Sequence, residues 1–502
     1  MDFVEEYKSL IYSLLYNGEY GQAIMLRNNA RKIWKSYDEE MCYIEALVEY
    51  STYHFPLALF WAERGYRINP DYQPNKEFIE LLRNEVIEFS DYNFLFPYDV
   101  SFLNKKLRII IHCGVSPLMD YTGKLFMEVF EALGHDVFMF RHDVEKDIYK
   151  EFLSFTSKGV DGSICFNNFG WFISLDGIDD FYGFYHVNNL NYLFDHPLYY
   201  IDSLRKAPKE GIVSCVDRKH VNFINRFFPN IKQNFFFPLG GEEFPESCNK
   251  PWKERCIDVL FVGTYEKNVN GPNDDFSDRV YRKLAANTSI LVDDAIIETF
   301  QSLSEKEMGM FFPGYSNCVD EVKKDKNILQ FIIERYCDID LNNTSFFRKK
   351  AVISLANAGI KVTIYGRGWE NIASEYRNIQ WGGAISAKEC IEKICDSKIV
   401  LNVMPWFKDG IHDRVANAML NRAVCITDPT EYLLERYTDQ EDIIYFSLDH
   451  IEELPKLVSD ILCNENKAEL LINNAYQKAK FTETWQNRGI EYIYRLMNGD
   501  FI

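Results

Sequence analysis

The sequence predicts an α/β protein with two successive Rossmann-like domains and a cleft between them, preceded by an all-helical region. Short apolar runs of strand length alternate with helical stretches from residue 105 onward, which is typical of parallel sheets. A polar break containing proline, at 250–254, divides that alternation into two halves. Residues 1–90 show helical periodicity alone.

Length and composition limit the possible functions. A chain of 502 residues is long enough for two or three domains. Its net charge of −20 argues against nucleic-acid binding, because neutralising phosphates needs clustered Lys and Arg. No apolar run reaches about 18 residues, and the N-terminus lacks the pattern of a signal peptide, so we expect a cytoplasmic protein without a membrane span. The 12 cysteines have no zinc-binding spacing, which predicts free thiols and no metal.

The N-terminal region, about residues 1–100, is expected to resemble tetratricopeptide repeats. Ala23 is matched about 35 residues later by Ala58, and Pro70 closes the second unit, which fits the period of that repeat. Only about two units are visible, so such an array must pack on a neighbouring domain. A plain bundle of helical hairpins explains the pattern equally well.

Residues 105–249 predict the first Rossmann-like domain. The buried strand 107–111 leads through a glycine loop into a helix that ends at Gly134, and a second strand follows at 136–140. This order is a βαβ unit. Further short apolar runs extend the sheet, and they lie at 162–166, 191–194, 211–215 and 234–237.

Residues 255–480 predict the second Rossmann-like domain. It opens with the apolar strand 257–263, and a stretch of helical spacing at about 275–345 reads as an insertion. A terminal amphipathic helix lies within 481–502. The remaining strands of this sheet are expected at 361–365, 378–381, 399–403, 423–426 and 443–447.

The segment 401–428 carries the strongest functional pattern. It reads as a strand end, a glycine-containing loop, an amphipathic helix and a second strand. A helix N-terminus at the carboxyl edge of a parallel sheet offers free N–H groups and positive potential to a phosphate. The plain alternative makes Asp413 an N-cap and Arg414 its solvated neighbour. The polar residues gathered there are Asp409, His412, Asp413, Arg414 and Asn417.

Two glycine turns follow strands of the same half. Tyr365-Gly366-Arg367-Gly368-Trp369 lets backbone approach a ligand and offers one fixed positive charge, and Gly263-Thr264-Tyr265 opens the domain in the same manner. Tight packing between a strand and its loop is the alternative for both. Neither a dinucleotide-binding glycine fingerprint nor a P-loop is present, which argues against dehydrogenases and P-loop NTPases.

In the first domain, Asp195 and His196 end a strand, so their side chains can enter the cleft and supply a general base. A capped turn before Pro197 is the alternative. Asp120, in the loop after the first strand, is a second candidate base. Asp338-Ile339-Asp340 has a metal-binding spacing but falls in the helical insertion, where we expect a solvated turn.

With these residues in place, about residues 105–500 resemble the GT-B fold glycosyltransferases, particularly the CgeB-like (spore-maturation type) group. The resemblance rests on four short segments. They are the 365–369 turn, Trp381-Gly382-Gly383, His412-Asp413-Arg414 with Asn417 and Asp428, and the 481–488 segment that opens the last helix.

The resemblance implies a nucleotide-sugar donor in the second domain, an acceptor in the first, and a last helix that crosses back to the first. The resemblance also implies that no metal or other cofactor is needed, because in this fold the helix dipole and basic side chains stabilise the departing diphosphate. Asp409 and Asn417 stand where retaining relatives carry two glutamates, so retention or inversion stays open. By resemblance, Gly366, Arg367, Met404, His412, Asp413, Arg414 and Asn417 face the diphosphate and ribose, and Gly382, Gly383 and Ile385 lie near the base.

The expected function is that of a hexosyltransferase that uses a nucleotide sugar, with a UDP-sugar favoured. The helical region favours a protein acceptor, such as a bacterial flagellar or surface protein. A surface polysaccharide is the nearest alternative acceptor. An inactive scaffold that binds nucleotide or a protein partner is the alternative of another class.

Overall fold

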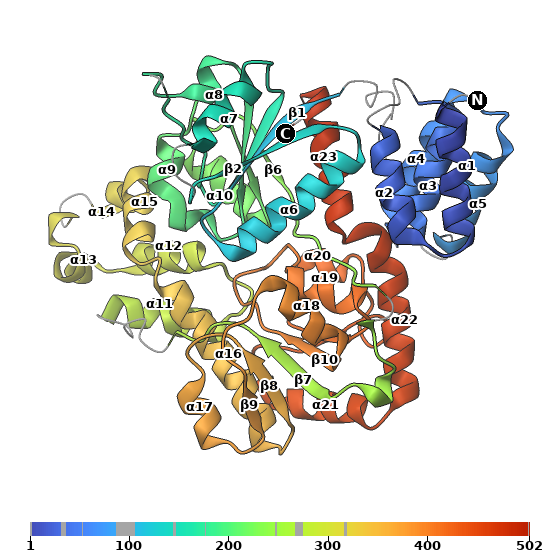
Figure 1. Ribbon diagram of the computed structural model, residues 1–502. Helices are drawn as coiled ribbons and strands as arrows, with labels where there is room; N and C mark the ends of the chain where they lie inside the picture. Colours follow the sequence, from blue (N-terminus) through green and yellow to red (C-terminus); the bar gives the residue numbers. More distant parts are fainter. Residues whose placement is uncertain are drawn as a thin grey trace.

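Figure 1 shows a helical region beside two α/β domains, in a computed structural model of the chain. Both domains contain a six-stranded parallel sheet, so the predicted fold class is confirmed. Among the described helices, none combines the length and apolar character that crossing a bilayer requires. The structure describes residues 3–31, 37–52, 54–86, 106–143, 147–175, 177–245, 248–266, 275–315, 319–499 and 501.

The helical region is an array of antiparallel neighbours with its own small core. The residues expected at helix crossings, Ala23, Ala58 and Ala62, are fully buried. A repeat of the tetratricopeptide kind stays a prediction, and the boundary expected near 100–105 lies outside the described residues. The helices are α1 (Phe3–Tyr16), α2 (Tyr20–Arg31), α3 (Glu39–Ser51), α4 (Phe55–Ile68) and α5 (Gln73–Val86).

The first sheet has the strand order β2-β1-β3-β4-β5-β6, all parallel, so the chain reverses its direction of growth between β1 and β3. The strands are β1 (Arg108–Cys113), β2 (Asp136–Arg141), β3 (Gly162–Phe166), β4 (Asn188–Leu193), β5 (Gly211–Cys215) and β6 (Asn234–Phe236). Its helices include α6 (Pro117–Ala132), α7 (Asp147–Thr156), α8 (Phe181–Phe184), α9 (Ile201–Arg205) and α10 (Arg218–Phe227).

The second sheet has the order β12-β11-β10-β7-β8-β9, also parallel, and its reversal point lies between β7 and β10. The strands are β7 (Ile257–Val262), β8 (Val362–Tyr365), β9 (Ile379–Trp381), β10 (Ser397–Asn402), β11 (Val424–Thr427) and β12 (Ile444–Tyr445). Its helices include α16 (Ile339–Asn357), α17 (Glu370–Glu375), α18 (Ala387–Cys395), α19 (Asp413–Leu420), α20 (Glu431–Leu434), α21 (Leu454–Leu462) and α22 (Glu465–Thr482).

A helical insertion separates β7 from α16, the helix that crosses over to β8. It packs against the first domain, since its Phe276 and Ile296 share a buried cluster with Phe223 and Leu198 of that domain. The insertion therefore ties the second domain's chain to the first domain. Its helices are α11 (Asp275–Ala286), α12 (Val292–Ser302), α13 (Glu305–Phe311), α14 (Val319–Val322) and α15 (Lys326–Arg335).

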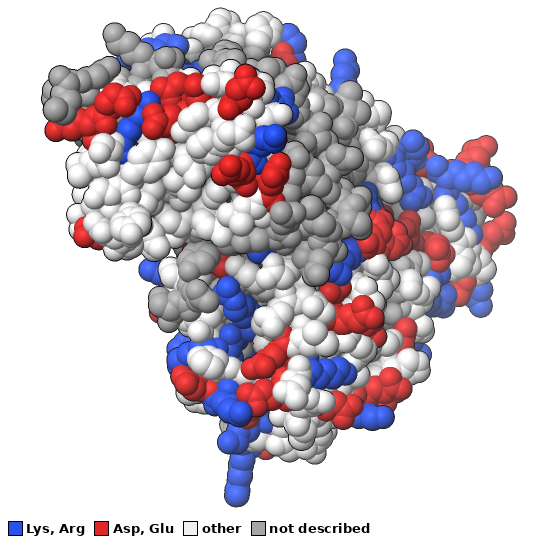
Figure 2. All heavy atoms as spheres, turned by 90° about the vertical axis from the view of Figure 1, so that its right-hand side faces the viewer, with Lys and Arg blue, Asp and Glu red and all other residues white. Residues whose placement is uncertain are grey.

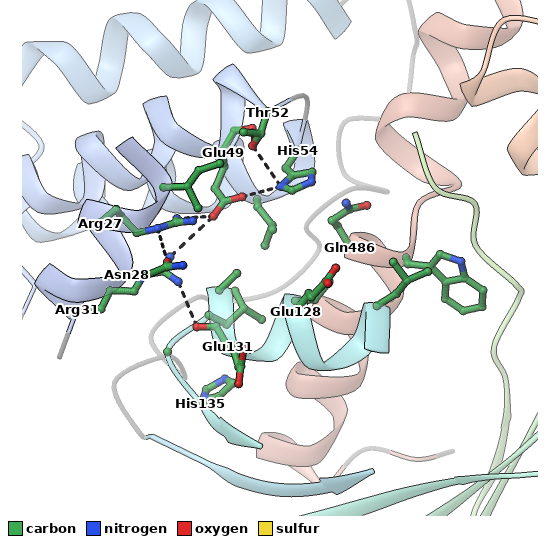
Figure 3. A pocket seen from close by; sticks show the side chains of 18 of the residues that line it. Arg27, Asn28, Arg31, Glu49, Thr52, His54, Glu128, Glu131, His135 and Gln486 are labelled. Atoms are coloured by element: carbon green, nitrogen blue, oxygen red, sulfur yellow. Dashed lines mark hydrogen bonds and ion pairs between the residues drawn. The ribbon is translucent and has the colours of Figure 1, made fainter. Parts of the chain in front are cut away.

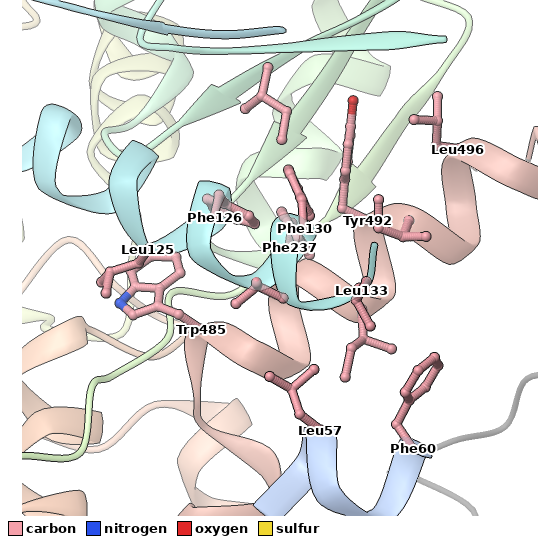
Figure 4. Packing of buried hydrophobic residues seen from close by; sticks show 14 of the residues in the cluster. Leu57, Phe60, Leu125, Phe126, Phe130, Leu133, Phe237, Trp485, Tyr492 and Leu496 are labelled. Atoms are coloured by element: carbon pink, nitrogen blue, oxygen red, sulfur yellow. The ribbon is translucent and has the colours of Figure 1, made fainter. Parts of the chain in front are cut away.

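The last helix, α23 (Trp485–Asn498), lies against α6 of the first domain (Figure 4). Gly489 permits this close approach, because a Cβ there would lie 2.4 Å from the Val129 side chain. Thr484 starts the helix with a capping box. Arg488 ties the start of α23 to the chain that follows β6 by donating to the Pro238 carbonyl at 2.9 Å, and it also donates to Glu483 at 2.8 Å.

The segment 241–244 joins the two sheets and rests on α19. The Asn417 amide oxygen accepts the Glu242 N–H at 2.8 Å. Asn421, one turn later, accepts the Phe244 N–H at 2.9 Å and donates to the Glu242 carbonyl at 2.8 Å. Two asparagines of one helix thus satisfy the backbone of this connection and hold it in place.

Charge on the face seen in Figure 2 is mixed. Acidic and basic side chains are interspersed there, among large uncharged areas. Non-specific nucleic-acid binding rests on basic residues gathered on one face. The described residues of this face instead have the charge pattern of an ordinary solvated surface.

Glu243 in the connection makes stability depend on pH. Burial raises the pKa of its carboxyl from 4.5 to about 7. The folded chain therefore binds this proton more tightly than the unfolded chain, and stability falls as pH rises through that window. Glu243→Gln should raise the free energy of unfolding by about 3 kcal/mol at pH 8 and by little at pH 4.5. Urea unfolding at both pH values measures this, and an equal gain at both would contradict it.

Candidate functional site

The carboxyl edge of the second sheet, where β7 and β10 part, is the point at which open α/β sheets bind ligands. Val262 ends β7, and Met404 follows β10. Met404 is buried, and its N–H donates to the Asp428 carboxylate at 2.8 Å. Burial raises the pKa of Asp428 to about 6. The loop after β10 is therefore fixed from the end of β11.

Arg414 crosses this reversal point from the first turn of α19. Its guanidinium donates to the Val262 carbonyl, and its Nη2 lies 3.3 Å from the Met404 sulfur. The side chain is only 6% exposed, and burial lowers its pKa. His412, rather than Asp413, is the N-cap of the helix, and burial lowers the pKa of its imidazole to about 4. The alternative of a solvated Arg414 beside an Asp413 cap is therefore wrong.

Arg348, on α16, reaches the same point and was missed by the sequence reasoning. Its Nη1 donates to the Thr264 carbonyl at 2.9 Å, and its Nη2 lies 3.7 Å from the Met404 sulfur. Burial and the neighbouring Arg414 lower its pKa to about 9. The cationic run Arg348-Lys349-Lys350 in an acidic chain was the available signal, and it lies just beyond the predicted insertion at about 275–345.

The two arginines form an anion site. Both guanidiniums are buried, both touch the sulfur of Met404, and their other partners are backbone carbonyls, an imidazole and the Trp406 ring. Among the described residues, neither forms an ion pair with a carboxylate, and Asp428 acts on both only from a longer distance. Burying two neighbouring positive charges is costly unless an anion compensates them. The geometry therefore suits a ligand with two negative charges, held by charge-assisted hydrogen bonds.

The glycine turns lie at the carboxyl ends of β7, β8 and β9. Their glycines allow these loops to pack closely against one another. A Cβ on Gly366 would lie 2.2 Å from the Gly263 carbonyl, and one on Gly382 would lie 2.3 Å from the Tyr365 ring. Gly366 also donates to the Gly383 carbonyl at 2.8 Å. These loops lie close together, and their assignment to a donor site stays a prediction. The other candidate residues on them are Thr264, Tyr265, the half-buried Ile385 and the exposed Arg367.

Asp409 and Asn417 contact the first domain and the connection instead of facing the arginine pair. The Asp409 carboxylate lies 3.1 Å from the Arg218 guanidinium, and its N–H donates to Asp217 at 2.7 Å. The Asn417 amide oxygen is taken by Glu242. These contacts engage the Asp409 carboxylate and the Asn417 amide oxygen, and the expectation that both residues meet the sugar nucleotide stays a prediction.

Asp195 stands at the end of β4 on the facing edge of the first sheet. Its carboxylate accepts the Asn167 amide at 2.8 Å and the Tyr200 hydroxyl at 2.9 Å, and burial raises its pKa. Asn167 and Asn168 both adopt positive φ, of 48° and 71°, a strained conformation for non-glycine residues. This arrangement holds a half-buried carboxylate in one orientation.

The other two catalytic candidates are engaged elsewhere. His196 is fully buried, its Nδ1 accepts the Leu198 N–H at 3.1 Å, and its Nε2 lies 3.2 Å from Asp293 of the insertion. It therefore anchors α12 and does not reach the cleft, which corrects its catalytic assignment. Asp120 accepts the Gly114 N–H at 2.7 Å and so closes the loop after β1.

Helix α16 spans the distance between the arginine pair and Asp195. Asp340 lies eight residues before Arg348, about 12 Å along the helix axis. It is buried and accepts the Tyr199 hydroxyl at 3.0 Å, next to the Tyr200 that holds Asp195. The expected solvated turn at 338–340 is therefore wrong. No group of three His, Cys, Asp or Glu side chains close enough to share a metal occurs among the described residues.

Residues 348–494 match the family model described as glycosyl transferase-like. The match begins at Arg348 and includes Arg414, so both arginines of the anion site lie within it. No curated protein matches the chain. The CgeB-like subgroup is not tested by this match and stays a prediction.

Solved structures of several glycosyltransferases have similar folds. A sucrose-phosphate synthase from Thermosynechococcus elongatus is 11% identical, with a TM-score of 0.42 over 77% of this chain and 97% of that chain. An alpha-glucosyltransferase in complex with UDP and DNA is 9% identical, with a TM-score of 0.48 over 78% and 100%. A glycosyltransferase from Rickettsia africae is 10% identical, with a TM-score of 0.45 over 79% and 100%.

Proposed function

We propose that this chain is a glycosyltransferase that moves a hexose from a nucleoside diphosphate sugar, UDP-linked for preference, to an acceptor bound by the first Rossmann-like domain. The observation that carries the proposal is the pair Arg348 and Arg414 at the reversal point of the second sheet. A diphosphate supplies the compact double negative charge that these two buried guanidiniums lack. The family match of the surrounding segment supports the same activity.

In the proposed reaction, the bond between the sugar carbon and the diphosphate oxygen breaks, and the diphosphate leaves with the electron pair. Arg348 and Arg414 stabilise the charge that develops on that oxygen, and the N-terminus of α19 adds its dipole. An acceptor oxygen bonds to the sugar carbon and gives its proton to Asp195. The raised pKa of this carboxyl suits it to hold a proton in the cleft.

We propose a protein acceptor, bacterial and cytoplasmic, of the flagellar or surface kind. The helical region supports this choice, because its α4 packs on α23, the helix that lies against α6 of the acceptor-binding domain. A surface polysaccharide is the alternative acceptor. An inactive nucleotide-binding scaffold is the alternative favoured by Asp409 and Asn417, whose polar atoms hold the domains together.

The test is a panel of UDP-, GDP-, ADP- and CMP-sugars, with released nucleotide measured with and without EDTA. We expect slow hydrolysis of one or more UDP-sugars that EDTA does not abolish. UDP at about 100 times its dissociation constant should also stabilise the fold by about 2.7 kcal/mol. Binding without turnover of any sugar or acceptor would favour the scaffold, and turnover lost with EDTA would refute metal independence.

A further inference from the structure

A large cavity lies between the helical region and the first Rossmann-like domain, away from the arginine pair. Its volume is about 1100 Å³, at the upper end of the range for ligand sites. The walls come from α2, α3 and α4 on one side and from α6 on the other (Figure 3). The connection at 241–243 and the start of α23 close one end.

One end of the cavity is rich in hydrogen-bond donors. Arg64 stacks over Tyr37 at 4.7 Å and Trp61 at 4.9 Å, and pairs with no carboxylate among the described residues. His135 is 5% exposed, and its Nδ1 accepts the Leu107 N–H, so its Nε2 carries the proton. That Nε2–H has no partner among the described residues. This end is suited to a carboxylate.

The two other arginines that line this side of the cavity are already paired with carboxylates. Arg27 pairs with Glu45 at 2.8 Å and with Glu49 at 2.6 Å, and Arg31 pairs with Glu45 at 2.5 Å. These four side chains balance one another. Arg64 is therefore the guanidinium of this wall that remains for a ligand.

The opposite end of the cavity is acidic. Glu242 and Glu243 line it, and burial raises the pKa of both carboxyls. Their nearest hydrogen-bond donors are neutral hydroxyls, those of Tyr121 and Tyr476, and Arg422 lies 3.7 Å from Glu243. A cation entering this end would compensate carboxylates that are poorly solvated.

The α6 wall between the two ends is mixed, because Glu128 and Glu131 line it as well as apolar side chains, and Glu131 lies beside His135 (Figure 3). Leu125, Val129 and Leu133 line it, facing Leu57 of α4, and they belong to the cluster drawn in Figure 4. From Leu125 to Ala132, the last residue of α6, the separation along the helix is about 11 Å, and the lining continues to Gly134 and His135. An extended peptide covers that length with about four or five residues.

We propose that this cavity is a second binding site, which holds an extended segment of the acceptor protein with an acidic side chain at Arg64 and a basic side chain at Glu242 and Glu243. The proposal rests on the proposed function, with a protein as acceptor. The first turn of α6 lies at the carboxyl edge of β1, about 18 Å from its last turn. A segment anchored in the cavity therefore reaches the cleft by running along α6.

The acidic end also connects the cavity to α19, the helix of the proposed donor site. The backbone of Glu242 is held by Asn417 and Asn421 of α19, the helix whose first turn carries Arg414. A basic side chain bound at this end thus contacts Glu242, whose backbone is held in place by α19.

A displayed library of random heptapeptides, selected on the full chain, tests the proposal. We expect enriched peptides to carry an acidic and a basic residue four or five positions apart. Synthetic copies should bind about tenfold more weakly to Arg64→Gln and to Glu243→Gln, and saturating UDP should not displace them. Arg67→Gln is the matched control, because Arg67 is an exposed arginine of the same helix that does not line the cavity.

Enrichment of no peptide, enrichment without this charge spacing, or binding by both variants as tight as by the wild-type chain would overturn the second site. Thermal unfolding of each variant shows whether it is folded, and the two variants alter opposite ends of the cavity. Because selection needs no turnover, its failure leaves the nucleotide-sugar panel unaffected. If no nucleotide sugar is hydrolysed in that panel, the peptide selection still shows whether the cavity binds a peptide.

Discussion

Arg348→Met should lower kcat/KM for the nucleotide sugar by at least about 100-fold, the scale of losing one preorganised donor to a developing oxyanion. The same change should leave the stability of the unliganded fold equal or raise it by about 1–3 kcal/mol. Methionine keeps the apolar stem packed and removes a buried charge that repels Arg414. Steady-state kinetics and urea unfolding of one variant measure both effects.

Arg255→Met is the matched control for this prediction. Arg255 is equally buried, burial lowers its pKa to about 10, and it donates to the Lys250 and Ser397 carbonyls next to the opposite, amino edge of the sheet. Its loss should lower stability and leave UDP affinity unchanged. If Arg348→Met behaved in the same way, Arg348 would be a structural residue and the anion site would fail.

Asp195→Asn should lower kcat by about 100- to 10,000-fold while UDP affinity stays within about twofold. Asparagine can keep a contact with Tyr200 or Asn167 but cannot take the acceptor proton. Since burial raises the pKa of Asp195, the acid limb of the wild-type pH–rate profile should lie above the usual range of an aspartate. That limb should be absent from the residual activity of the variant.

Asp120→Asn is the comparison for this second prediction. Its carboxylate closes the loop after β1, so we expect a modest change in acceptor KM and a preserved acid limb. Retained turnover in Asp195→Asn together with lost turnover in Asp120→Asn would transfer the role of base to Asp120. Equal losses in both would show that neither titration governs the profile.

Much of the fold could be predicted because parallel strands are buried on both faces and read as short apolar runs. The run at 257–263 and the run at 399–403 are β7 and β10 almost residue for residue. Their adjacency could not be read from the sequence, because strand order depends on tertiary packing. That adjacency is what places Arg414 against the carbonyl of Val262.

Part of the candidate site was predictable from the sequence. Arg414 and His412 were recognisable from a loop followed by a helix start, which is a local pattern, and Met404 was included through the family resemblance. Arg348 lies more than 50 residues earlier along the chain, on a helix whose local signal is the cationic run 348–350. The interdomain contacts of Asp409 and Asn417 depend on Arg218 and Glu242, which are equally remote in sequence.

The most direct test of the central claim is photolabelling with an azido-UDP-sugar, followed by mapping of the modified peptides. We predict label within residues 257–266, 362–385 and 400–420, around the carboxyl edges of β7 to β10. Excess UDP should prevent the labelling, and Arg348→Met should reduce it strongly. UDP-protected label confined to the helical region or to the first sheet would contradict a donor site at Arg348 and Arg414.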